Sequence, residues 1–77
     1  SLYWVYPNPT ENWIYVENST KEMIERIEVY NVEGRLMYSN KPNHFKLYVW
    51  LDQYADGLYF VHLRSENETV IKKIIKN

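Results

Sequence analysis

Residues 57–77 read GLYFVHLRSENETVIKKIIKN, and this stretch decides the class of fold. Apolar and polar residues alternate over Leu58–Ser65, at the period of a half-buried β-strand. Thr69–Lys76 is a second strand-like run, rich in β-branched residues. The polar residues Ser65–Glu68 between the two runs are typical of a turn. The chain therefore ends in two strands separated by a short turn.

The same pattern recurs upstream, where helical periodicity is weak. Turn signals lie at Pro7-Asn8-Pro9, Glu33-Gly34, Asn40–Asn43 and Asp56-Gly57. Strands are expected at Leu2–Tyr6, Trp13–Glu17, Ile24–Asn31, Arg35–Ser39, His44–Leu51, Leu58–Ser65 and Thr69–Lys76. Short strands at this spacing, without helices between them, predict an all-β fold: an immunoglobulin-like antiparallel β-sandwich of about seven strands. A small barrel is the alternative.

Alternation also assigns side chains to the two faces of each strand. The residues expected to point inward are Ile14, Val16, Ile27, Val29, Phe45, Leu47, Val49, Leu51, Tyr59, Val61 and Leu63. Those expected to point outward include His44, Lys46, Tyr48, Trp50, Phe60, His62 and Arg64. The last strand is ambiguous, because both of its alternating sets mix apolar residues with lysine, and a shift of one residue would exchange them. Its lysines are typical of an edge strand.

The chain has 77 residues, which predicts one domain over residues 1–77. A domain of this size buries only roughly 60–65% of its unfolded surface and needs additional stabilisation. It has no cysteine and two histidines, which excludes disulfides and thiolate zinc sites and disfavours a structural metal. Three Trp, eight Tyr and two Phe are present, so aromatic bulk is expected to stabilise the core.

Charge and hydropathy exclude other classes of protein. Nine Lys and Arg stand against ten Asp and Glu, and a nucleic-acid-binding domain would show a basic excess. No apolar run approaches the ~20 residues of a membrane span, and no signal peptide is present. The chain begins at Ser1 without Met, so we expect it to be a piece of a longer chain.

Catalytic and cofactor motifs are missing from the sequence. It contains no Gly-x-Ser-x-Gly motif and no cysteine nucleophile, and its two glycines cannot form a phosphate-binding loop. Asp52 and Asp56 flank a turn, where capping is the ordinary role of aspartate. We therefore expect a non-enzymatic domain with no cofactor and no small-molecule substrate.

Two groups of aromatic residues have specific interpretations. Trp13, Tyr15, Tyr48 and Trp50 are expected to face outward, either as a stacking platform for sugars or bases or as a cover for the open face of the sandwich. Tyr59 follows Gly57 at the start of a strand and is expected to turn inward. Its hydroxyl can then bond back to the turn, as in the tyrosine corner of Greek-key sandwiches.

Three segments occur in an order that resembles a known family. VYPNPTENWIYVE begins at Val5, IEVYNVEGRLMYS begins at Ile27, and LDQYADGLYFVHLRSENETVIKKIIKN begins at Leu51. Together they resemble the type IX secretion (Por secretion system) C-terminal sorting domain, type A, of Bacteroidetes cargo proteins. The resemblance covers nearly the whole chain.

The resemblance implies a secretion signal rather than a catalyst. Cargo of this kind enters the periplasm through a separate N-terminal signal peptide. The C-terminal domain is then recognised by the type IX outer-membrane translocon and is usually removed by a sortase-type peptidase. The parent protein is attached to the cell surface or released.

The resemblance also implies roles for individual residues. The motif and fold determinants are Pro7, Asn8, Pro9, Gly34, Arg35, Gly57, Tyr59 and Val61. The residues expected to contact the translocon are Lys72, Lys73, Ile74, Ile75, Lys76 and Asn77. One departure is Asp56, where the family often has a small residue or proline before the glycine. A partner could read the last strand by strand addition, with lysines setting specificity; alternatively, the strand merely closes the sandwich.

Two other functions compete with secretion. A carbohydrate-binding accessory module would use the outward aromatic residues. A purely structural immunoglobulin-like spacer would have no binding partner of its own. The sequence assigns no oligomeric state.

Overall fold

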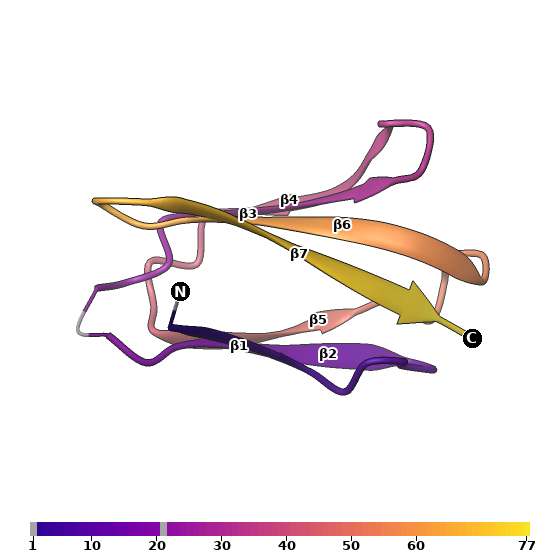
Figure 1. Cartoon of the computed structure of the whole chain (residues 1–77), viewed down its shortest axis with the longest axis horizontal. Coiled ribbons are helices and arrows are strands. Elements are labelled where there is room, and N and C mark those ends of the chain that lie inside the picture. Colours follow the sequence, from indigo (N-terminus) through magenta and orange to yellow (C-terminus); the bar gives the residue numbers. More distant parts are fainter. Residues whose placement is uncertain (1, 21) are drawn as a thin grey trace.

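The computed structural model describes residues 2–20 and 22–77, and these form two stacked β-sheets (Figure 1). The strands are β1 (Tyr3–Tyr6), β2 (Trp13–Asn18), β3 (Arg26–Asn31), β4 (Leu36–Asn40), β5 (Lys46–Trp50), β6 (Gly57–Arg64) and β7 (Thr69–Lys76). No helix is present in the described part of the chain. The predicted all-β class is confirmed.

One sheet has three strands in the order β1-β2-β5, and the other has four in the order β4-β3-β6-β7. Neighbouring strands within each sheet are antiparallel. The two layers pack face to face, which confirms the immunoglobulin-like sandwich and not the barrel. The predicted strand beginning at Ile24 starts instead at Arg26, but Ile24 still forms an isolated bridge with His44.

The core lies between the layers and is supplied by alternate residues of the strands. Ile14, Val16, Ile27, Val29 and Val61 have no exposed surface, as the alternation predicted. Phe45 is the exception, because it is 42% exposed. It lies in a bend before β5 begins at Lys46, so the alternation of that strand does not extend to it.

The prediction that aromatic bulk fills the core is wrong. Among the described residues, only Tyr3 and Tyr59 are aromatic members of the buried core, and the other members are Ile, Leu and Val. Trp4 and Trp50 are each 58% exposed. The physical reason is strand parity: these rings alternate with the aliphatic residues that face the opposite sheet, so they point away from it. Two partly buried rings, Tyr38 and Tyr54, pack against the margin of this core.

Glycine is required at the turn between β3 and β4. Gly34 has φ of 82°, a left-handed conformation that costs glycine little. Its N–H donates to the carbonyl of Asn31 over 3.0 Å. The Asn31 side chain accepts from the backbone N–H groups of Glu33 and Arg35, which closes the turn.

No helix in the described residues has the length and apolar character needed to cross a membrane.

Candidate functional site

The last strand, β7, lies at an edge of the four-stranded sheet, next to β6 (Figure 1). Its pairing with β6 places Tyr59 opposite Ile74 and Gly57 opposite Lys76. Ile74 is fully buried, whereas Ile71 is 57% exposed and Lys73 is exposed. This register resolves the ambiguity of the sequence: Val70, Lys72, Ile74 and Lys76 face the core side, and Ile71, Lys73 and Ile75 face outward.

The second half of β7 has a partner outside its own sheet. The side-chain amide of Asn8 donates to the Lys73 carbonyl over 3.0 Å, and its oxygen accepts from the Ile75 N–H over 2.9 Å. Thr10 continues this contact: its N–H donates to Ile75 O over 2.8 Å, and its carbonyl accepts from Asn77 N–H over 2.9 Å. We call Asn8–Thr10 the latch segment. It joins the β1–β2 connection to the end of the chain.

The proline residues explain how the latch segment reaches β7. Pro7 and Pro9 have no N–H to donate, so the ladder between β1 and β2 stops at Tyr6. The chain then crosses toward the other sheet, where Thr10 forms a parallel bridge with Lys76. Both the Tyr6–Pro7 and the Asn8–Pro9 peptide bonds are cis. The turn motif therefore contacts the C-terminal strand directly.

Lys76 is a buried side chain with a charged tip. Its side chain is 8% exposed, and its Nζ lies 3.2 Å from Oδ1 of Asp56, which is 73% exposed. The aliphatic stem is thus covered while the ammonium group reaches the surface at the carboxylate. Sequence reasoning treated Asp56 as a capping residue and missed this pair, because only the register of β6 with β7 brings the two residues together.

Tyr59 holds the turn that contains Asp56 from the core side. Its hydroxyl donates to the Ala55 carbonyl over 2.6 Å, and its ring is buried. The predicted tyrosine corner is therefore confirmed. Gly57, with φ of 151°, begins β6 between these two residues. The corner and the Lys76–Asp56 pair stabilise the same end of the four-stranded sheet.

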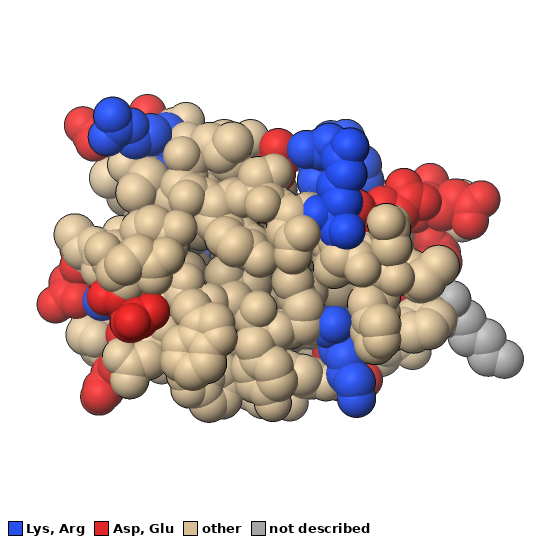
Figure 2. Space-filling view, turned by 180° about the vertical axis from the view of Figure 1, so that it is seen from behind, with Lys and Arg blue, Asp and Glu red and all other residues tan. Residues whose placement is uncertain are grey.

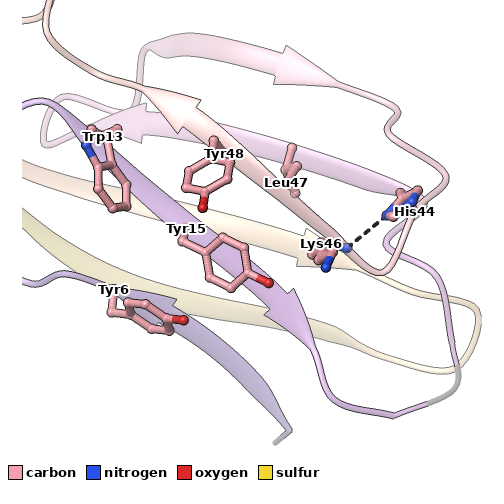
Figure 3. A pocket seen from close by; sticks show the side chains of 7 residues that line it. All are labelled: Tyr6, Trp13, Tyr15, His44, Lys46, Leu47 and Tyr48. Carbon is pink, nitrogen blue, oxygen red and sulfur yellow. Dashed lines mark hydrogen bonds between the residues drawn. The ribbon is translucent and has the colours of Figure 1, made fainter.

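A second feature is a row of rings on the outer surface of the three-stranded sheet (Figure 3). We call it the aromatic face; it comprises Trp4, Tyr6, Trp13, Tyr15, Tyr48 and Trp50. Ring centroids are 5.3 Å apart for Tyr6 and Tyr15 and 5.1 Å apart for Tyr15 and Tyr48. The neighbouring rings are mutually tilted or edge-on. Four of them line a hollow together with His44, Lys46 and Leu47: Tyr6, Trp13, Tyr15 and Tyr48.

The sequence anticipated four members of the aromatic face. Trp4 and Tyr6 join them because β1 pairs with β2, opposite Glu17 and Tyr15. Polar groups lie among the rings: Tyr15 donates to Glu17 over 3.1 Å, and the Lys46 N–H lies 3.4 Å from Nδ1 of His44 (Figure 3). The face therefore combines stacking surface with hydrogen-bonding groups.

The family model for the secretion system C-terminal sorting domain matches residues 4–77. The chain belongs to this family. The domain is thus a type IX secretion sorting signal, which implies export to the cell surface or the extracellular space and interaction with the type IX machinery. Sorting domains of this family are in general non-catalytic. The search of curated proteins gives no match.

The residues of the sorting domain expected to contact the translocon do not share one surface. Lys73, Ile75 and Asn77 are exposed, and Lys72 is half-buried. Ile74 and Lys76 are buried and hold β7 in place. Gly34 and Arg35 lie at the β3–β4 turn; β4 and β7 are the opposite edges of that sheet. Val61 belongs to the core.

Charge on the sorting domain is mixed in sign. Seen from behind, lysines and arginines are interspersed with acidic residues around an uncharged middle (Figure 2). Over residues 2–20 and 22–77, no cluster of His, Asp and Glu side chains could hold a metal ion. Burial raises the pKa of the Tyr3 hydroxyl above its ordinary value of 10.0, while the Ser65 and Asn18 side chains act in the opposite direction.

Proposed function

We propose that this sorting domain is the part of a larger secreted protein that the type IX outer-membrane translocon recognises. The parent protein is then carried across the outer membrane, a sortase-type peptidase removes the domain, and the parent is attached to the surface or released. The match to the sorting-domain family over residues 4–77 is the observation that supports this most directly. In this function the domain has no catalytic role and spans residues 1–77 as one unit.

Recognition in this proposal uses the terminal strand and its lysines. Of the predicted contact residues, Lys73, Ile75 and Asn77 have side chains within reach of a partner, and Lys72 is partly accessible. Ile74 and Lys76 act indirectly, since they position the strand from below. Lys73 and Ile75 place one cationic and one apolar side chain at alternate positions on one face of the strand.

An export assay tests the proposal. A reporter with an N-terminal signal peptide is fused upstream of residue 1 and expressed in a strain that has the type IX apparatus. We expect the reporter at the surface or in the medium, and its size there reports whether the domain has been removed. A reporter that stays in the periplasm while the domain is folded would contradict the sorting function and favour the spacer.

The same assay tests the recognised residues. Deletion of Lys72–Asn77 also removes the buried Ile74 and Lys76, so loss of export from this truncation is ambiguous. Lys73→Glu is a more specific test than the truncation. Lys73 is exposed, so reversing its charge should leave the fold intact. The matched control is Lys41→Glu, the same change at an exposed lysine between β4 and β5. Equal export of the two variants would refute recognition through Lys73.

Glycan binding is the second candidate function, and the aromatic face favours it. Exposed rings interleaved with polar groups are suited to stacking on sugar rings and to hydrogen bonding with hydroxyl groups. Trp4 and Trp50 are exposed on this face, so their fluorescence can report binding there. Titration with soluble glycans should change tryptophan fluorescence if the function is real, and a flat response would dismiss it.

A further inference from the structure

The outer edge of β7 is only partly occupied. In an antiparallel strand, the N–H and C=O groups of successive residues point alternately to the two sides of the strand. The N–H and C=O of Ile75 point away from β6, since they bond to Asn8 and Thr10. By the same alternation, the backbone groups of Thr69, Ile71 and Lys73 also point away from β6.

The latch segment divides this edge into two parts. It uses the Lys73 carbonyl, both backbone groups of Ile75 and the Asn77 N–H. In the described part of the chain, the N–H and C=O of Ile71 and the N–H of Lys73 have no protein hydrogen-bond partner. A free edge therefore runs over residues 69–73, directly before the occupied part.

The side chains along the free edge specify what could pair with it. Ile71 is 57% exposed and Lys73 is exposed two positions further along the same face. Cross-strand neighbours favour an apolar side chain beside isoleucine and an acidic one beside lysine. Glu66 and Glu68 lie just before Thr69, where the free edge begins. The edge therefore has negative charge near its first residue and positive charge at Lys72 and Lys73, where it ends.

We propose that an extended segment of a partner protein adds to β7 along residues 69–73, with an apolar side chain beside Ile71 and an acidic side chain beside Lys73. The backbone of the segment forms hydrogen bonds with the N–H and C=O of Ile71 and with the N–H of Lys73. Its side chains contact those of Ile71 and Lys73 and determine specificity. The assignment of this segment to the export machinery rests on the proposed function. The binding mode itself rests on the free edge alone.

The direct test uses two synthetic peptides and the 77-residue domain. The probe is a capped peptide, Thr-Glu-Thr-Val-Thr, which places Val beside Ile71 and Glu beside Lys73 when it pairs antiparallel to β7, and its control replaces Glu with Lys. Backbone amide signals are followed by NMR during titration. We expect saturable shifts and slower hydrogen exchange at Ile71 and Lys73 with the acidic peptide, and at least tenfold weaker binding of the lysine peptide.

Ile71→Pro provides a second test. Proline removes the outward N–H, and its predecessor Val70 is already extended, the conformation favoured before proline. The variant should bind the acidic peptide at least tenfold more weakly, whereas Ile71→Ala, which keeps the N–H, should lose less. If Ile71→Pro does not fold, the comparison of the two peptides on the wild-type domain decides.

Three outcomes would overturn the proposal: equal binding of both peptides, shifts confined to another surface such as the aromatic face, or pairing of two copies through Ile71 without peptide. In the export assay, Ile71→Pro should reduce export at least tenfold while Ile71→Ala retains more. A wild-type domain that does not export its reporter contradicts the proposed function, and the peptide titration still decides the binding mode.

Discussion

Lys76 illustrates how one side chain can be buried and charged at once. Its aliphatic stem is buried at the end of β7, in the way that an apolar side chain would be. Its ammonium group contacts the exposed carboxylate of Asp56. A pair with one solvent-exposed partner contributes only about 0–1 kcal/mol. Packing of the stem should therefore contribute more to stability than the ion pair.

The first prediction separates these two contributions at Lys76. Lys76→Ala should lower the free energy of unfolding by about 1–2 kcal/mol, because it removes the covered stem. Asp56→Ala should cost about 0–1 kcal/mol, since it removes only the charge partner. Urea denaturation of the two variants provides the comparison. Equal losses would mean that the ion pair, not the stem, is the stabilising element.

The second prediction concerns Tyr3 and pH. Burial raises the pKa of its hydroxyl, so the folded state holds the proton more tightly than the unfolded state does. The resulting stability is present below the unfolded pKa of about 10 and is lost as pH rises through the folded pKa. Stability of the wild type should therefore fall more steeply above pH ~10 than that of Tyr3→Phe. Parallel curves from denaturation at several pH values would contradict this.

At the scale of elements, the latch segment connects the two sheets. It lies between β1 and β2 in sequence, yet it pairs with β7 of the other sheet. The Asn8 amide carries one donor and one acceptor, so it can replace a backbone peptide group at the edge of the strand. The last residues of the chain are thereby protected from fraying, which is the usual fate of a terminal strand.

The third prediction tests the latch segment by hydrogen exchange. Asn8→Ala removes both side-chain bonds to β7, and the one that holds the Ile75 N–H is worth about 1 kcal/mol. Exchange of the Ile75 amide should therefore become roughly fivefold faster, while that of Ile74 changes less. Glu11→Ala, an exposed change in the same connection, is the control. Unchanged exchange at Ile75 would show that the side chain of Asn8 does not hold the strand.

At the scale of the whole molecule, the two surfaces of each sheet have different composition. The inner surfaces are mainly aliphatic, and the aromatic face covers the outside of the three-stranded sheet. The free energy of unfolding of a globular domain is only about 5–15 kcal/mol, and a domain of this size lies toward the lower end. The destabilisation caused by truncating one core side chain is therefore a large fraction of the total free energy of unfolding.

The fourth prediction compares the two surfaces. Ile14→Ala should destabilise the domain by about 2–5 kcal/mol, because Ile14 has no exposed surface and lies between the sheets. Trp50→Ala should cost well under half as much, since Trp50 is 58% exposed. Thermal and urea unfolding measure both. A larger loss for Trp50→Ala would mean that the aromatic face, rather than the aliphatic core, stabilises the sandwich.

Local sequence was sufficient to predict the strands, most of their faces and the tyrosine corner. Alternation identified Ile14, Val16, Ile27 and Val29 as core residues, because strand geometry directs successive side chains to opposite faces. The position of Gly57 before Tyr59 was enough to predict that the hydroxyl bonds back to the turn, and the structure shows the Ala55 carbonyl as the acceptor. Family membership also followed from ordered local motifs, and the family match over residues 4–77 bears it out.

Tertiary structure alone decided which face of β7 is buried, how Lys76 pairs with Asp56 and where the latch segment binds. It also placed Trp4 and Tyr6 beside the other rings of the aromatic face, through the pairing of β1 with β2. Each of these depends on the register or pairing of segments distant in sequence. Local alternation is the same in either register when both sets of a strand mix apolar and charged residues. Only contact with β6 and with Asn8–Thr10 distinguishes them. Among the described residues, that contact leaves free both backbone groups of Ile71 and the N–H of Lys73.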